Sequence, residues 1–255
     1  MKVFAHIFPL PVKKQLKICL EFSIGCMVTI STPVLLSLNQ DIIQLIKMAS
    51  REIPIAIHGP YHDLYPGSID PFIRSVALRR YNQVLELTKS MEIKFITLHL
   101  NYLENIHGHH RVEWLSNASQ TFSKLQYIDT PIHIENTKES DPDIFLSVLS
   151  NITRPNVGMC LDIGHVVAYS TRSLRVWIKK LSRYINELHI HECSPGRDIH
   201  EPLGSGLMDW NEIFCSLNSA GINISKVFLT LEPRTADELR QDLHYLSHEL
   251  GYDIH

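Results

Sequence analysis

The feature that most constrains this chain is an eightfold alternation of short apolar runs with longer segments of helical periodicity. The apolar runs predict strands at residues 3–8, 26–31, 53–58, 94–100, 130–136, 156–162, 185–191 and 226–232. Most of these runs are nearly continuously apolar before a final polar residue, which is typical of parallel strands covered on both faces. The chain therefore needs a fold that buries several parallel strands.

The segments between the runs show the apolar periodicity of amphipathic helices. They cover residues 13–21, 40–50, 71–90, 112–127, 142–149, 174–184, 210–220 and 236–250. Strand and helix alternation builds a parallel sheet, and eight such units close a barrel. The sequence predicts the α/β class and a single (β/α)8 TIM barrel, although residues 22–34 can be divided between strand and helix in more than one way.

Length and composition agree with one domain. The 255 residues match the ~250 residues typical of one such barrel. No low-complexity tract, short repeat or linker rich in Pro, Gly or Ser marks a boundary, so we expect one domain over residues 1–255. Hydrophobic residues make up 44% and charged residues 20%, the balance of a soluble globular protein.

Cysteine usage and the N-terminal segment indicate a cytoplasmic protein. The five cysteines are scattered singly without a C-x-x-C pair, which predicts neither a disulfide framework nor a thiolate zinc site. The segment MKVFAHIFPLPVKK interrupts its apolar stretch with His6, Pro9 and Pro11. We therefore expect no signal peptide and no membrane span.

Six of the eight predicted strands place a His, Asp or Glu at or near their end. These residues are His58, His99, Glu135, Asp162, His189 and Glu232. Residues two apart on a strand share a face, so these side chains are expected to form a ring at the C-terminal mouth, where barrel enzymes carry their active sites. A single such histidine is best explained as an ordinary polar group beside a loop. Six together favour a metal site, because a cation offsets the repulsion between buried carboxylates.

Two short segments add candidates to the ring. In Asp162-Ile163-Gly164-His165, Gly164 permits a sharp turn that would return His165 to the site. The alternative is a helix-capping Asp162 and a surface His165.

The second segment lies in the longest irregular stretch, residues 186–209, which contains His191, Arg197, Asp198 and His200. Arg197 is suited to grip a phosphate or carboxylate, and a loop salt bridge explains it equally well. No Walker loop or dinucleotide-binding glycine fingerprint occurs, so a nucleotide cofactor is not expected.

Several motifs resemble, in order, those of the xylose isomerase-like TIM barrel superfamily, which includes endonuclease IV as well as sugar isomerases and epimerases. The similarity runs from about His58 to Leu246. Its segments are IHGPYHDLYPGS, ITLHLNY, IHIENT, GMCLDIGHV, ELHIHE, GRDIHEPLGSGLMDW and TLEPR. Any one of them is a weak signal, whereas their order is specific.

The resemblance to endonuclease IV implies nine ligands for a three-zinc cluster. The matching positions are His58, His99, Glu135, Asp162, His165, His189, Asp198, His200 and Glu232. Tyr61 resembles the tyrosine that this enzyme places against DNA near an abasic site. Such a cluster hydrolyses phosphodiesters, because it supplies a hydroxide near neutral pH and stabilises both reacting oxygens.

The resemblance to the isomerases and epimerases implies a single metal instead. The matching ligands are Glu135, Asp162, His189 and Glu232, with His165 and Arg197 in contact with substrate. Glu135 and Glu232 are then the catalytic residues that move a proton at the substrate carbon. Gly204-Ser205-Gly206 stands where relatives commonly have Gly-Glu-Gly, which removes a carboxylate.

These two implications compete. The number of ligands favours the phosphodiesterase, whereas the net charge of −3 and the lack of a basic run argue against binding duplex DNA. We favour a divalent-metal-dependent isomerase or epimerase of a small sugar or sugar phosphate, with Zn, Mn or Co at one to three ions per chain. The alternative is an endonuclease IV-like zinc phosphodiesterase acting on abasic DNA. A non-catalytic metal-binding barrel is less favoured, because Glu135 and Glu232 are both present.

Overall fold

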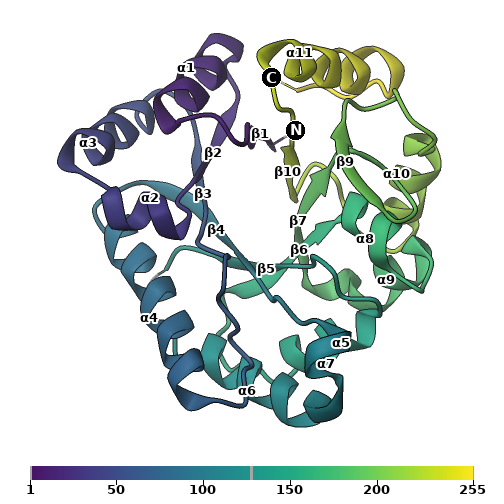
Figure 1. The fold of residues 1–255 in the computed structure, drawn as a ribbon. Coiled ribbons are helices and arrows are strands. Elements are labelled where there is room, and N and C mark those ends of the chain that lie inside the picture. The colour runs from purple at the N-terminus through teal and green to yellow at the C-terminus, as the bar shows by residue number, and fades with distance from the viewer. Residues whose placement is uncertain (1, 127–128, 255) are drawn as a thin grey trace.

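The computed structural model describes residues 2–126 and 129–254, in which eight parallel strands close into a barrel. The order around the ring is β1-β10-β7-β6-β5-β4-β3-β2, so the first strand completes the ring against the last (Figure 1). The predicted single (β/α)8 barrel is confirmed. Its strands are β1 (Lys2–Ala5), β2 (Gly25–Thr29), β3 (Ile55–His58), β4 (Ile93–His99), β5 (Ile132–Glu135), β6 (Val157–Asp162), β7 (Ile185–Ile190) and β10 (Phe228–Leu231).

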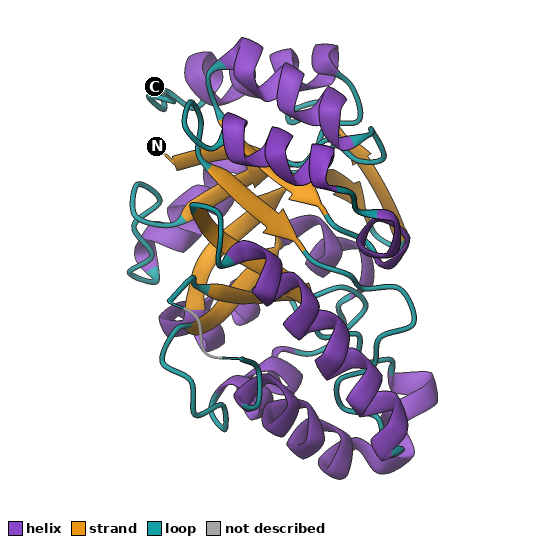
Figure 2. Cartoon of the chain, turned by 90° about the vertical axis from the view of Figure 1, so that its left-hand side faces the viewer, coloured by secondary structure: helices purple, strands orange, loops and turns teal. Residues whose placement is uncertain are grey.

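Helices surround the strands on the outside, as the side view shows (Figure 2). Each predicted helix has a counterpart, and the structure adds the short helices α2, α5 and α8. The predicted helix at 112–127 ends at Ser123, and its last predicted residue, Tyr127, lies outside the described residues. The helices are α1 (Val12–Phe22), α2 (Thr32–Ser37), α3 (Gln40–Ala49), α4 (Pro71–Thr88), α5 (Glu104–His107), α6 (Arg111–Ser123), α7 (Pro142–Leu149), α8 (Ile163–Tyr169), α9 (Leu174–Leu181), α10 (Trp210–Ser219) and α11 (Ala236–His244), with a π-helical turn at Tyr245–Glu249.

Local signals fix where several helices begin and end. Asp70 and Asp141 each accept a hydrogen bond from a backbone N–H of the first helical turn, and a proline follows each of them at the first position. In the stretch at 22–34, which the sequence left open, Ser23 adopts a left-handed conformation (φ 54°) that ends α1. The chain then enters β2 at Gly25.

A hairpin replaces most of the irregular stretch expected between β7 and α10. Strands β8 (Glu192–Ser194) and β9 (Arg197–Glu201) pair antiparallel outside the barrel ring, with Gly196 at φ 75° in the turn. The buried carboxylate of Glu192 accepts hydrogen bonds from Trp210 Nε1 (2.7 Å) and from the backbone N–H of Gly204 (3.0 Å). These bonds anchor the hairpin to α10. Short-range periodicity did not reveal the hairpin, because its two strands are short and most of their side chains are polar.

The inside of the barrel divides into two halves. At the N-terminal ends of the strands, Phe4, Met27, Ala56 and Phe95 form a buried cluster against Phe228. The rings of Phe4 and Phe95 lie 4.9 Å apart, and those of Phe95 and Phe228 lie 4.4 Å apart. At the C-terminal ends, the same strand faces carry imidazoles and carboxylates. We call these two parts the aromatic half and the polar half.

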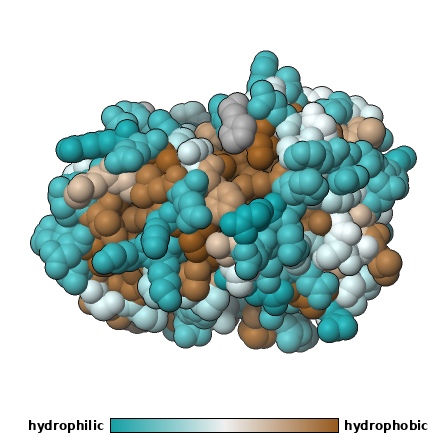
Figure 3. Space-filling view, turned by 90° about the horizontal axis from the view of Figure 1, so that it is seen from above, coloured by the Kyte–Doolittle hydropathy of each residue, from teal (hydrophilic) through white to brown (hydrophobic). Residues whose placement is uncertain are grey.

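The outer surface mixes apolar and hydrophilic side chains. Figure 3 views the molecule from above, over α1 and α11, and shows brown apolar side chains toward the left and centre, interrupted by teal hydrophilic ones. Among the large hydrophobic residues exposed to solvent are Leu36, Phe72, Val112 and Leu207. Within residues 2–126 and 129–254, no helix combines the length and the apolar composition needed to cross a bilayer.

Candidate metal centre

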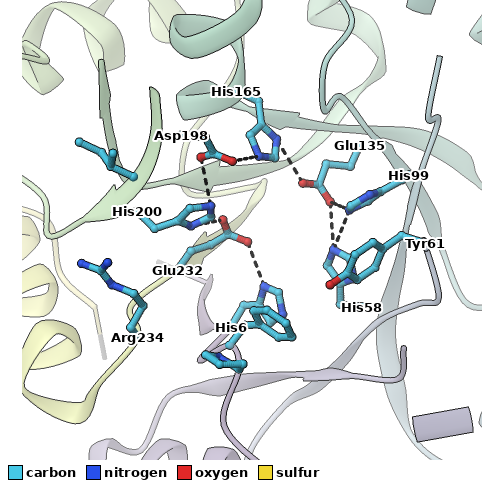
Figure 4. A pocket seen from close by; sticks show the side chains of 13 residues that line it. His6, His58, Tyr61, His99, Glu135, His165, Asp198, His200, Glu232 and Arg234 are labelled. Carbon is cyan, nitrogen blue, oxygen red and sulfur yellow. Dashed lines mark hydrogen bonds and ion pairs between the residues drawn. The ribbon is translucent and has the colours of Figure 1, made fainter. Parts of the chain in front are cut away.

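All nine predicted ligands lie in one cluster at the C-terminal mouth of the barrel, and Figure 4 shows those of them that line the cavity. His58, His99, Glu135 and Asp162 are the last residues of β3, β4, β5 and β6. His189 lies one residue before the end of β7, and Glu232 directly follows β10. The other three ligands come from outside the barrel strands: His165 from α8, and Asp198 and His200 from β9. The cluster opens into a cavity of about 410 Å³.

The first donor group joins β3, β4 and β5. His58 Nε2 lies 3.1 Å from His99 Nε2, and each of these nitrogens lies 3.2 Å from Glu135 Oε2. Tetrahedral zinc with bonds of 2.0–2.1 Å has ligand atoms about 3.3 Å apart, so this spacing suits a single ion. Burial lowers the pKa of His99 despite the nearby Glu135 carboxylate, which leaves its imidazole neutral near pH 7. We call this group the β3–β4 site.

The second donor group lies deepest and consists of Glu135, Asp162, His189 and Glu232. His189 Nδ1 is 3.1 Å from Glu232 Oε1, 3.4 Å from Glu135 Oε1 and 3.8 Å from Asp162 Oδ2. The Asp162 and His189 side chains are fully buried, below the residues that line the cavity. We call this group the floor site.

One nitrogen of the floor site has no hydrogen-bond partner among the described residues. His189 Nε2 bonds to Glu187 Oε1 at 3.0 Å, whereas the buried Nδ1 makes no hydrogen bond. A buried lone pair surrounded by carboxylate oxygens is unfavourable unless a proton or a cation lies among them. Burial disfavours protonation of His189, but Cys160 and the carboxylates of Glu135 and Glu232 raise its pKa well above the usual value. The floor site therefore fits a divalent cation.

The third donor group lies under the hairpin and contains His165, Asp198 and His200. His165 Nε2 is 3.3 Å from Asp198 Oδ2, and His200 Nε2 is 3.1 Å from Asp198 Oδ1. Burial opposes protonation of both histidines, but neighbouring carboxylates, Asp198 among them, raise the pKa of His165 to about 10 and that of His200 to about 11. In the absence of a cation, both imidazoles thus hold a proton. We call this group the hairpin site.

The Asp162-to-His165 segment combines both alternatives considered for it. Asp162 Oδ1 does cap α8, because it accepts a hydrogen bond from the backbone N–H of His165. The His165 side chain is nevertheless largely buried, and its Nδ1 lies 3.2 Å from Asp162 Oδ2. Gly164 is part of α8 rather than a sharp turn, and a Cβ atom there would lie 2.2 Å from His191 Cε1. Glycine is needed here because the His191 ring packs against the helix.

Two of the three predicted substrate-binding residues line the cavity, and the third does not. Tyr61 lines the cavity, with its ring stacked on His99 at 4.6 Å and edge-on to His58 at 5.4 Å. His165 also lines the cavity. Arg197 is exposed at the start of β9 and is not among the lining residues, whereas Arg234, which the sequence analysis did not select, does line it.

His6 lies in the cluster although it was not among the predicted site residues. One residue past the end of β1, its Nδ1 donates to Glu232 Oε1 (2.9 Å) and its Nε2 bonds to Thr29 Oγ1 (2.7 Å). The His6 ring stacks on His58 at 4.8 Å. The available signal was a histidine at the end of a predicted strand. Because prolines follow it, His6 was interpreted only as an interruption of the N-terminal apolar stretch.

His191, a candidate from the stretch predicted to be irregular, lies directly after β7. Its Nε2 lies 3.3 Å from each carboxylate oxygen of Asp162, and its ring stacks on His200 at 3.9 Å. It therefore lies between the floor site and the hairpin site. Alternation on the strand gives the signal, because His189 and His191 share a face.

The family comparison covers most of the chain. The family model described as "Xylose isomerase-like TIM barrel" matches residues 32–248. The uncharacterized protein MJ1311 of Methanocaldococcus jannaschii is 24% identical over 183 residues, which are 67% of this chain and 62% of that protein. A probable endonuclease 4 of Mycobacterium leprae is 23% identical over 202 residues, which are 74% of this chain and 76% of that protein.

Solved structures share the fold over nearly the whole chain. A D-tagatose 3-epimerase-like protein superposes with a TM-score of 0.82 at 21% identity, covering 98% of this chain and 97% of the other. The IOLI protein with a bound zinc atom superposes with a TM-score of 0.72 at 15% identity, covering 97% of each chain. At these identities the likeness shows a common barrel.

Proposed function

Since the chain belongs to the xylose isomerase-like TIM barrel family, we propose that it is a divalent-metal-dependent enzyme that isomerises or epimerises a small sugar or sugar phosphate. The floor site carries this proposal. There, carboxylates from β5 and from the end of β10 approach the same buried nitrogen, His189 Nδ1, beneath a small cavity. This arrangement combines a cation site with two carboxylates able to move a proton.

The floor-site residues would hold a Zn, Mn or Co ion. Their mixed nitrogen and oxygen donors suit these metals. When bound, such an ion polarises a carbonyl and its neighbouring hydroxyl and so acidifies the carbon between them. Cations bound to members of the fold, such as the zinc in the IOLI protein, support this assignment.

Glu135 and Glu232 would exchange the proton with the substrate. Burial opposes their ionisation, but His189, the hydrogen bond from His58 to Glu135 and the ion pair of His200 with Glu232 hold the pKa of both carboxyls well below the usual range. Both are therefore ionised and able to accept a proton near pH 7. In an epimerisation, one carboxylate takes the proton from one face of the carbon. The other carboxylate takes up a proton from water and delivers it to the opposite face, and the first carboxyl then returns its proton to water.

The cavity supports a small substrate. Its volume of about 410 Å³ lies in the range of small-molecule sites. Phe8, Pro9 and Ile199 line its apolar part. Among the described residues, Arg234 is the Lys or Arg side chain that lines it, which is far fewer cations than a duplex DNA surface requires.

A zinc phosphodiesterase is the second candidate function. The β3–β4 site and the hairpin site favour it, because a mononuclear isomerase has no chemical need for either group. Three neighbouring donor groups suit an enzyme that stabilises both the attacking and the leaving oxygen of a phosphodiester. The similarity to a probable endonuclease 4 supports the same candidate.

We also propose one catalytic domain over residues 1–255, working in the cytoplasm. The ring of strands from Lys2 to Leu231 supports the first point, because the first and last strands pair with each other. The five free cysteines support the second point, since such thiols persist in a reducing compartment.

The experiment that tests the function measures metal and chemistry on the same sample. The chain is purified without chelator or affinity histidines, its metal is measured by elemental mass spectrometry, and it is incubated with ketoses and ketose phosphates in ²H₂O. We expect about one ion per chain and incorporation of deuterium at the carbon next to the carbonyl.

Other outcomes contradict the proposal. About three zinc ions per chain together with cleavage of abasic DNA, and no deuterium in any sugar, would establish the phosphodiesterase instead. A chain that binds no metal after reconstitution would overturn both candidate functions.

A further inference from the structure

A buried carboxylate, Glu187, lies directly beneath the floor site. It belongs to β7, two residues before His189, and its side chain is fully buried inside the barrel. It marks the boundary between the aromatic half and the polar half, because its β10 partner in the sheet register is Phe228. A charged group at this depth is costly unless its hydrogen bonds are complete.

Both oxygens of Glu187 have two partners. Oε2 accepts from Thr97 Oγ1 (2.7 Å) and His133 Nδ1 (2.9 Å). Oε1 accepts from Thr230 Oγ1 (3.0 Å) and His189 Nε2 (3.0 Å). Four hydrogen-bond partners at 2.7–3.0 Å occupy the acceptor positions of an ionised carboxyl group. The group is therefore a carboxylate held by side chains from four strands.

The network decides where His189 carries its proton. A carboxylate only accepts hydrogen bonds, so His189 must donate through Nε2. In the neutral imidazole, Nδ1 is then the unprotonated nitrogen. That nitrogen is the one surrounded by Glu135, Asp162 and Glu232.

We propose that Glu187 is a positioning residue that fixes the tautomer and the ring orientation of His189 and thereby makes Nδ1 available to a divalent cation. The role rests on the proposed metal centre. Glu187 is not among the residues lining the cavity, so it acts through His189 and not on the substrate. Carboxylates that hold the second nitrogen of a histidine ligand have this effect on metal sites in general.

Substitution of Glu187 by glutamine tests the role with little change of shape. A glutamine amide group is able to donate to His189 Nε2 and so favours the tautomer with the proton on Nδ1, which cannot bind a cation. We expect Glu187→Gln to weaken zinc binding by about 10–100-fold, measured with Zn²⁺ alone by competition with a chromophoric chelator on the metal-free full chain.

Glu192→Gln is the matched control. It also replaces a fully buried carboxylate on the next strand segment, but Glu192 bonds to Trp210 and to backbone N–H groups of the hairpin region. We expect this variant to lose stability and to keep the zinc affinity of the wild type. An equal loss of affinity in both variants would mean that zinc binding reports stability alone, and it would overturn the positioning role.

The remaining outcomes separate this role from the metal centre itself. If the wild type binds zinc and Glu187→Gln binds it equally well, the positioning role is wrong and the metal centre stands. If the wild type binds no zinc, the metal centre falls and the role falls with it.

A measurement on the wild type keeps the test available if Glu187→Gln does not fold. In the zinc-loaded chain labelled with ¹⁵N-histidine, and with His189→Gln to assign the signal, we expect His189 to be protonated at Nε2. Protonation at Nδ1 would overturn the proposal.

Discussion

The aromatic half and the polar half of the barrel interior are built on the same strands, yet they obey different rules. Phe95 and His99 lie on one face of β4, and Phe228 and Glu232 follow the same alternation at the end of β10. In the aromatic half, rings in contact fill the space and exclude water. In the polar half, histidine nitrogens lie close to carboxylate oxygens, at 3.4 Å between His189 and Glu135 and at 3.1 Å between His200 and Glu232.

This difference separates stability from chemistry within one barrel. The aromatic half contributes to the free energy of unfolding through how completely its side chains fill the space. Only residues of similar size and shape can therefore replace them without loss of stability. The polar half depends on the positions of single atoms, because misplacing one donor leaves a buried charge unpaired. The four predictions below test whether the two halves can be changed separately.

The largest effect is expected in the polar half, from Glu232→Gln. The substitution keeps the size of the side chain but removes a proton acceptor and a cation ligand, so we expect turnover to fall by about 10²–10⁴-fold or more. Full turnover in this variant would remove Glu232 from the active site.

Phe95→Ala is the reciprocal change in the aromatic half. Phe95 is fully buried, and its truncation should lower the free energy of unfolding by about 3–5 kcal/mol. Urea denaturation measures the loss, and elemental analysis of the folded variant should find wild-type metal content. Loss of the metal at unchanged stability would show that the halves are not separable.

A smaller effect is expected from removing the hairpin donors, with Asp198→Ala and His200→Ala combined. If one ion occupies the floor site, the metal content stays and KM rises by about tenfold, which corresponds to about 1.4 kcal/mol of lost substrate binding. Steady-state kinetics and metal analysis of the same preparation measure both quantities. Loss of metal from the double variant would instead place an ion in the hairpin site and favour the phosphodiesterase.

The smallest effect concerns pH in the metal-free chain. The folded-state pKa values of about 10 for His165 and about 11 for His200 lie above the value near 6.5 of an unfolded chain. Their stabilising contribution is therefore complete below about pH 6.5 and is lost as the pH rises through about 10 to 11. Melting temperatures between pH 7 and 10 should fall.

Two variants sharpen this pH comparison. Phe95→Ala should show the same slope from a lower starting stability, because the aromatic half contributes no titrating group. His200→Ala should flatten the slope. A melting temperature that rises with pH in the wild type would contradict the assignment of protonated histidines to the hairpin site.

The fold was predictable from the sequence because strand and helix periodicities are local signals. The gathering of the strand-end side chains was also predictable, because parallel strands bring their C-terminal ends together at one mouth of the barrel. Glu232 is an example: no neighbour in sequence explains it, and it reaches the cluster through the closure of the barrel.

The sequence did not predict where three residues lie relative to the site: Glu187, Arg197 and Arg234. A lone glutamate within β7 reads as an exposed polar residue, because its partners Thr97, His133 and Thr230 are distant in sequence. Arg197 stands beside two ligands in sequence, yet it opens β9 opposite Ser194 and is exposed. The path of the hairpin decides this orientation. Hydrogen bonds from Gly204 and Trp210 to Glu192 of β8 hold the hairpin in place.

The hairpin β8–β9 also makes one part of the site easier to change by substitution during evolution than the rest. Ligands on the barrel strands are tied in register to a neighbour on each side, so moving one of them disturbs the whole ring. Asp198 and His200 belong to a two-stranded sheet outside that ring. A lineage can therefore exchange these two donors, and with them the chemistry above the floor site, by altering one hairpin while the barrel stays closed.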